Sequence, residues 1–148
     1  MFSAVLLASV AILLPQVANA IAYSGPISGG TIASLTVGSG FSAISLDGVT
    51  VTGTVTFNAV DSGATILMKD TTVGGAGIIF TQALSNCVVT LSAVTAVSTA
   101  YGLTFAALTS TAVTVSASTV TGTSRGGYFL GIDGRDHVRH NVRVDDDG

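Results

Sequence analysis

Charged residues are scarce in this chain. They make up 9% of its 148 residues, glutamate and tryptophan are absent, and the formal net charge is −3. Nucleic-acid binding requires a positively charged surface, so a total of five basic residues predicts no nucleic-acid partner. Disorder requires little hydrophobicity and much charge, whereas 48% of these residues are hydrophobic. The composition therefore predicts one folded domain.

Residues that would mark an active site are also missing. The segment 21–124 contains no histidine, so its many serines have no triad partner. The glycines at 38–40 are not followed by G-K-[ST], which a phosphate loop needs. Cys87 is the only cysteine, which excludes a disulfide within the chain. We interpret Cys87 as a small buried residue in a strand, or else as the partner of a cysteine in another chain. We expect no enzyme activity and no cofactor.

The first twenty residues have the pattern of a signal peptide. Residues 5–14 are an apolar run, Pro15 interrupts it, and Ala18-Asn19-Ala20 supplies small residues at the positions that a signal peptidase reads. The alternative is a buried or membrane-anchoring helix, although the run is shorter than the ~20 residues that span a bilayer. We predict a signal peptide over 1–20, secretion or display at the cell surface, and no transmembrane span in the mature chain.

Residues 21–124 contain a repeat of about 23 residues. Four segments begin with the pattern apolar-x-apolar, with starts 22, 23 and 24 residues apart, and each has a further apolar residue seven positions after its start. A threonine precedes that residue in every copy. The starts are Ile44, Ile66, Val89 and Val113, and the threonines are Thr50, Thr72, Thr95 and Thr119. A fixed period of this length is typical of a solenoid.

A second segment with the same period contains Phe57, Phe80 and Phe105. Alternate residues of a strand point to opposite faces, so apolar columns would fill the interior while threonine and serine coat the outside. Bends are expected at 47–48, 69–70, 92–93 and 116–117, and again at Gly53, 74–75 and Gly122. We predict an all-β fold, a short parallel β-helix or β-solenoid of about four coils over 21–124. Residues 21–32 would cap its N-terminal end, and open coil ends would allow self-association.

The composition changes at Arg125. Residues 125–148 contain no serine or threonine, but four arginines, both histidines and five aspartates. Three interpretations of this tail stay open. The first is a polar cap or a disordered, solvated end. The second is foreign sequence from a frameshift or truncation, and the third is a functional segment. The last rests on Asp136, His137 and His140, which a helix would bring together as weak candidate metal ligands.

Paired carboxylates would indicate a polysaccharide lyase or hydrolase, as many β-helix proteins are. The repeat region offers Asp47, Asp61 and Asp70. On adjacent coils Asp47 and Asp70 would lie about 4.8 Å apart, near enough for a retaining pair or a calcium site, but the alignment staggers them by one position. The other interpretation is that these aspartates hydrogen-bond their own backbone at turns.

Ice-binding solenoids carry flat arrays of T-x-T. That pattern occurs at 50–52 and 119–121, whereas the second threonine is replaced by Gly74 and Val97 in the other coils. Only one threonine column therefore persists through the repeat.

Two segments are rich in Ser, Thr, Val and Gly and lie downstream of the predicted signal peptide; they are LSNCVVTLSAVTAVSTAYGLTF (84–105) and VTVSASTVTGT (113–123). Over residues 1–124 the chain resembles the amino-terminal part of the trypanosome dispersed gene family proteins, and bacterial autotransporter passenger domains share the texture. The resemblance implies a large surface or secreted protein with adhesin-like β-helical repeats and membrane spans far downstream. This chain would then be a fragment or truncated copy, and the tail from Arg125 departs from the family.

The sequence thus predicts a non-enzymatic surface or secreted β-repeat protein with an adhesin-like role, contacting host extracellular molecules or glycans. The alternative is a carbohydrate-active β-helix fragment of the lyase or hydrolase kind. An ice-binding solenoid and a pseudogene product without a stable fold are the further alternatives.

Overall fold

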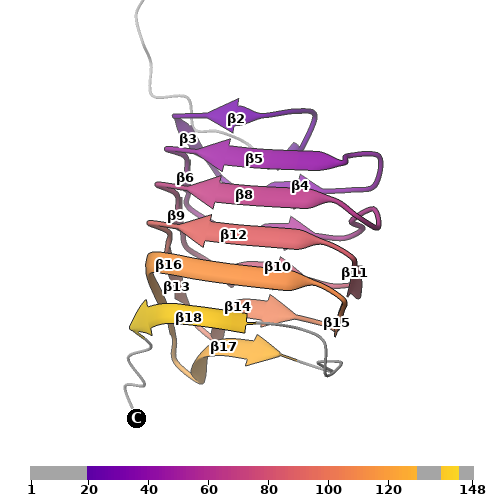
Figure 1. Cartoon of the computed structure of the whole chain (residues 1–148). Coiled ribbons are helices and arrows are strands. Elements are labelled where there is room, and N and C mark those ends of the chain that lie inside the picture. Colours follow the sequence, from indigo (N-terminus) through magenta and orange to yellow (C-terminus); the bar gives the residue numbers. More distant parts are fainter. Residues whose placement is uncertain (1–19, 130–137, 144–148) are drawn as a thin grey trace, which may run out of the picture.

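The computed structural model of this chain describes residues 20–129 and 138–143. Every element in these two ranges is a β-strand, and strands of successive coils pair in parallel. Figure 1 shows the stacked coils, with β2 toward the N-terminal end and β17 and β18 at the other end. The predicted fold, a parallel β-solenoid of about four turns with a period of about 23 residues, is confirmed. Within the described ranges no helix is long and apolar enough to span a membrane.

Each coil has three faces. The front face contains β2 (Ile27–Ser28), β5 (Ala43–Asp47), β8 (Thr65–Lys69), β12 (Val88–Ser92), the first half of β16 (Ala112–Gly122) and β18 (Val138–Arg143). The side face contains β3 (Thr31–Ile32), β6 (Thr50–Val51), β9 (Thr72–Val73), β13 (Thr95–Ser98) and the second half of β16. The back face contains β1 (Ile21–Ala22), β4 (Leu35–Val37), β7 (Val55–Phe57), β10 (Ile78–Phe80), β14 (Tyr101–Phe105) and β17 (Arg125–Phe129). Between back and front, β11 (Leu84–Ser85) pairs with β15 (Leu108–Thr109).

The interior consists of columns of like residues. Strand pairing places the four repeat starts in one buried column, as the alignment predicts; they are Ile44, Ile66, Val89 and Val113. The phenylalanines form a second column, in which the ring centroid of Phe80 lies 4.3 Å from that of Phe57 and 4.5 Å from that of Phe105. The planes are within 10° of parallel. The rise from coil to coil thus sets the spacing of the side chains.

The corner between front and side faces passes through a left-handed residue in every coil. It is a glycine in the first two coils, whereas Asp70, Ala93 and Ala117 take the same position in the next three, with φ between 46° and 53°. Left-handed backbone costs a residue with a Cβ about 1–2 kcal/mol. The bends predicted at 47–48 and its equivalents are confirmed.

From the second coil on, the residue after this corner is buried, and in two coils it carries a hydroxyl group. The hydroxyl of Thr71 donates to the carbonyl of Lys69, and that of Ser118 donates to the carbonyl of Ser116, both at 2.8 Å. Because each buried hydroxyl bonds to the carbonyl two residues before it, a polar side chain is accommodated in an otherwise apolar column.

Gly74 and Gly75 are required at the corner between side and back faces of their coil, whereas the next coil has Val97 and Ser98 there. A Cβ on Gly74 would lie 2.5 Å from the carbonyl oxygen of Thr52 in the preceding coil. Gly75, which follows with a φ of 56°, would bring its own Cβ within 3 Å of the backbone of Gly53. The predicted glycine corner is confirmed here.

Strand pairing continues past residue 124. β17 pairs with β14 and β18 pairs with β16, so these segments extend the back and front faces in register. His140 lies in β18, a strand, and not in the helix that would bring the three metal-ligand candidates together. Asp136 and His137 lie outside the described residues, as do residues 1–19 of the predicted signal peptide.

Candidate functional site

The side face carries a ladder of five exposed threonines, one on each successive coil. Strand pairing aligns them in a single column; they are Thr31, Thr50, Thr72, Thr95 and Thr119. We call this column the threonine ladder. The last four are the threonines of the repeat. Thr31 was missed because it precedes its partner Thr50 by only 19 residues, less than the period of the later coils.

Local geometry fixes the direction of each ladder side chain. Every ladder threonine is followed by a residue that points into the interior, such as Val51 after Thr50 or Val73 after Thr72, so the threonine points out. Threonine is branched at Cβ, which restricts its χ1 angle in a strand. The ladder therefore presents methyl and hydroxyl groups in a row with a spacing of about 4.8 Å, the distance between neighbouring strands.

The outward column beside the ladder is irregular. Two residues after each ladder threonine come Ala33, Thr52, Gly74, Val97 and Thr121. None of these is charged, and Val97 is 54% exposed. The side face is thus narrow and uncharged, with one regular column and one column of variable, mostly small residues.

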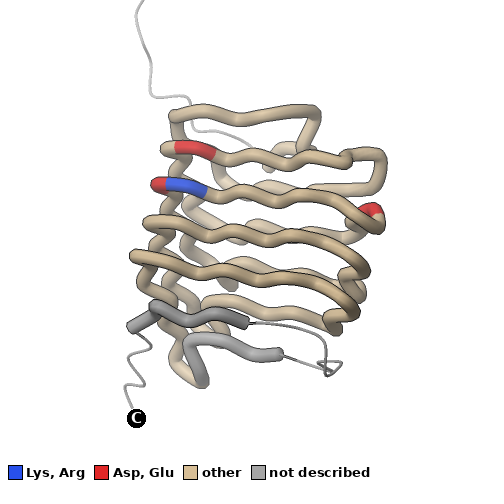
Figure 2. Tube along the Cα trace, in the orientation of Figure 1, with Lys and Arg blue, Asp and Glu red and all other residues tan. Residues whose placement is uncertain are grey.

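From β2 to β16 the front face is also regular and poor in charge. Outward residues of its central strands are small or hydroxyl-bearing, apart from the exposed Leu67 and Val88 and the charged Asp47 and Lys69. The charged residues of β5 and β8 lie at the ends of these strands, beside the corner with the side face (Figure 2). The described part of the outer surface therefore offers hydroxyls and small apolar groups far more than charges.

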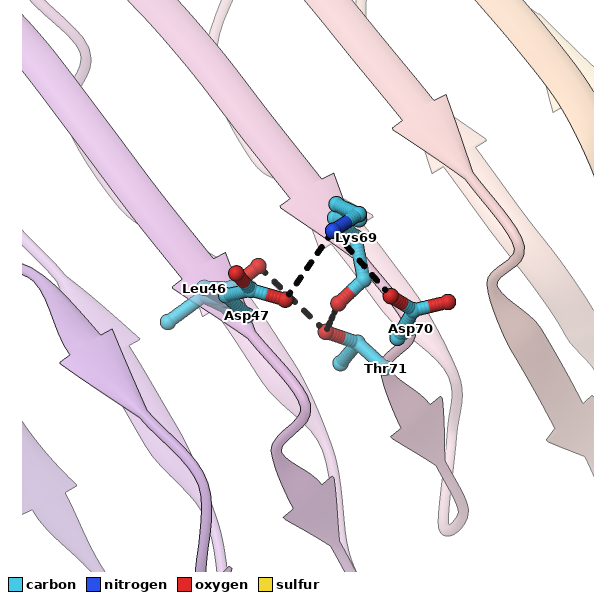
Figure 3. A network of polar contacts seen from close by, with 5 residues as sticks. All are labelled: Leu46, Asp47, Lys69, Asp70 and Thr71. Carbon is cyan, nitrogen blue, oxygen red and sulfur yellow. Dashed lines mark hydrogen bonds and ion pairs between the residues drawn. The ribbon is translucent and has the colours of Figure 1, made fainter.

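The charged cluster consists of Asp47, Lys69 and Asp70 (Figure 3). The ammonium of Lys69 lies 4.0 Å from a carboxylate oxygen of Asp47 and 3.4 Å from one of Asp70, and all three side chains are about half exposed. Strand pairing sets Asp47 opposite Lys69, so the stagger of the two aspartates that the alignment predicts is confirmed. The lysine stands beside both carboxylates, an arrangement that suits neither a retaining catalytic pair nor a calcium site.

Asp61 lies apart from this cluster, because it precedes β8 whereas Asp47, Lys69 and Asp70 lie at the far ends of β5 and β8. One of its carboxylate oxygens accepts a hydrogen bond from the backbone N–H of Gly40, at 3.0 Å. It therefore stabilises a turn by bonding to backbone, although to the preceding coil rather than to its own neighbours. Among the described residues, no group of three or more His, Cys, Asp or Glu could hold a metal ion.

Cys87 is buried, as expected, but it does not lie in a strand. It lies between β11 and β12, after Asn86 with a φ of 55°, at the corner between back and front faces. Its sulfur contacts the carbonyl oxygen of Ser85 at 3.3 Å, as the hydroxyl of Thr111 contacts that of Thr109 in the next coil. The thiol thus takes the structural place of a threonine hydroxyl.

Comparison with known proteins identifies no relative. No protein-family model, curated protein or solved structure matches the chain. The resemblance to trypanosome dispersed gene family proteins stays a prediction from the composition and period of the sequence.

Proposed function

We propose that the chain is a non-enzymatic secreted or cell-surface solenoid with an adhesin-like role, and that it binds extracellular host molecules or glycans through its outer faces. The observation that carries the proposal is the threonine ladder, which stays exposed and in register through five coils. A rigid row of identical groups suits the recognition of an extended, repetitive ligand, because each coil repeats the same contact.

The arrangement of aspartates supports a binding role over the carbohydrate-active alternative. Glycosidic cleavage by the usual route needs two carboxyl groups that face one bond. Asp61 lies at the opposite end of the front strands from Asp47 and Asp70, and Lys69 neutralises part of the charge of those two. These three residues therefore do not supply the required pair.

Binding of the full chain to immobilised matrix proteins and to a glycan array tests the proposal. A double substitution, Thr72→Lys with Thr95→Lys, places bulk and charge in the middle of the ladder. Thr65→Lys on the front face and Thr36→Lys on the back face add the same side chain at other exposed threonines and serve as matched controls. We expect the ladder variant to lose binding while the two controls retain it. No binding by the wild-type chain, or equal loss in all variants, would contradict the proposal.

A second candidate, ice binding, is favoured by the length of the ladder. The ladder has five threonines spaced by about 4.8 Å, one more than the four repeats in the sequence indicate, and the adjoining column is uncharged. Inhibition of ice recrystallisation by the wild-type chain, lost in the ladder variant, would support this function. A wild-type chain that leaves ice growth unchanged would remove it.

A further inference from the structure

A tyrosine side chain closes the N-terminal end of the solenoid. The backbone N–H of Tyr23 donates to the carbonyl of Thr36 on the back face, at 2.8 Å. Its hydroxyl accepts a hydrogen bond from the backbone N–H of Ser45 on the front face, at 3.0 Å. The side chain therefore crosses from the back face to the front face over the end of the interior, and only 4% of Tyr23 is exposed. Phe41 packs against it edge-on, with ring centroids 4.9 Å apart.

Tyr23 occupies a position where the first coil lacks a strand. All five residues of β8 pair with β5, whereas β2 pairs only with Leu46 and Asp47 at the end of β5. The residues from Ala43 to Ser45 have no strand partner on their N-terminal side among the described residues. In a parallel sheet the N–H of Ser45 would be bonded by a carbonyl of the preceding strand, and here the tyrosine hydroxyl accepts that bond instead.

Other features of this end also disfavour the addition of a strand. β1, β2 and β3 are each two residues long. Pro26 directly precedes β2 and has no N–H to donate, and Gly29 and Gly30 turn the chain away with positive φ angles. Short edge strands and proline at an edge are common ways to prevent strands of separate molecules from pairing.

We propose that Tyr23 is an end cap that keeps the open edge of β5 from pairing with a second copy of the chain. The partner that this edge fits is the same edge of another molecule, because a two-fold contact would cover both edges at once. The uncovered stretch, Ala43 to Ser45, has no charged side chain to repel such a partner. Tyr23 supplies the obstruction that charge supplies at many other sheet edges.

The test is the mass of the full chain in solution, produced in a secretory host and measured by sedimentation equilibrium at micromolar to millimolar concentration. We expect the wild-type chain to be monomeric and Tyr23→Ala to form dimers as concentration rises. Phe105→Ala removes a buried aromatic ring far from this end and controls for association that follows from lost stability alone. Tyr23→Ala combined with Ser45→Pro removes the N–H that the open edge would donate, and should restore the monomer.

Dimers in Tyr23→Ala that are absent in Phe105→Ala and abolished by Ser45→Pro would support the proposal. It is overturned if the wild type already associates, if Tyr23→Ala stays monomeric, or if Phe105→Ala associates equally. Association that persists with Ser45→Pro also overturns it. If Tyr23→Ala does not fold, as judged by circular dichroism, Tyr23→Leu replaces it, because leucine keeps apolar volume but has neither the reach nor the hydroxyl. The same outcomes are then expected.

Discussion

Phe80 is the residue whose loss should weaken the solenoid most, because its ring is stacked on both sides. It is 1% exposed and lies between Phe57 and Phe105, at 4.3 and 4.5 Å. Truncation of a buried phenylalanine to alanine costs about 3–5 kcal/mol. A domain of this size is stable by about 5–15 kcal/mol, so Phe80→Ala should remove a large part of the free energy of unfolding. Urea denaturation followed by far-UV circular dichroism measures the change.

A pair of leucine variants separates ring stacking from the loss of volume. Phe80→Leu breaks two aromatic contacts, whereas Phe57→Leu breaks one, since Val37 occupies the next position of that column. Each aromatic pair contributes about 0.5–1.5 kcal/mol beyond burial, so Phe80→Leu should be the more destabilising of the two by roughly that amount. Equal losses in the free energy of unfolding would show that the rings stack only because the rise from coil to coil brings them together. That result would refute a stabilising effect of ring stacking.

Four further substitutions test the N-terminal end, the corners and the charged cluster. Tyr23→Phe should lower the free energy of unfolding by about 1 kcal/mol, because it removes the acceptor of the hydrogen bond from the Ser45 N–H. Urea denaturation measures the change, and an unchanged midpoint would contradict the prediction. Ala93→Gly should raise the free energy of unfolding by up to about 1 kcal/mol, because it relieves the strain of left-handed backbone, whereas Ala96→Gly in β13 should lower it. Thermal melts measure both variants, and a lower melting temperature for Ala93→Gly than for Ala96→Gly would refute this prediction. Lys69→Met should change stability by less than about 1 kcal/mol in thermal melts at low and high salt, because its ion pairs are half exposed, and a larger loss would contradict this.

The inward columns of the solenoid could be predicted because packing restricts them strongly. A buried position such as that of Ile44 and Ile66 accepts only apolar residues, so the period appears directly in the sequence. The corner was harder to specify. Ala93 and Ala117 adopt left-handed backbone without the glycine or asparagine that would signal it. The N–H of Ala93 donates to the carbonyl of Ser116 in the next coil, and this bond helps to hold Ala93 in place. Thr71 also gave no sign of pointing inward, since only the structure supplies the carbonyl that satisfies its hydroxyl.

The two ends of the described solenoid depart from the sequence pattern of the repeat. The first front strand is short, and Tyr23 takes the place of its missing half. The connections between Thr31 and Thr50 are also shorter than those of the next coil, and this places Thr31 outside the 23-residue period. At Arg125 the composition changes while strand pairing does not, because backbone hydrogen bonds to the preceding coil depend little on side-chain type. Composition therefore located the repeat accurately and its limits poorly.

The threonine ladder is the surface feature that packing explains least. Its side chains point to solvent, so the interior does not require them. Threonine favours strands, and cross-strand threonine pairs add about 0.2–1 kcal/mol each, so stability accounts for part of the regularity. In the neighbouring outward column, backbone contact requires glycine at Gly74, but Val97 is 54% exposed and is not a threonine. This contrast between two columns of one face is the physical reason for assigning a binding role to the ladder.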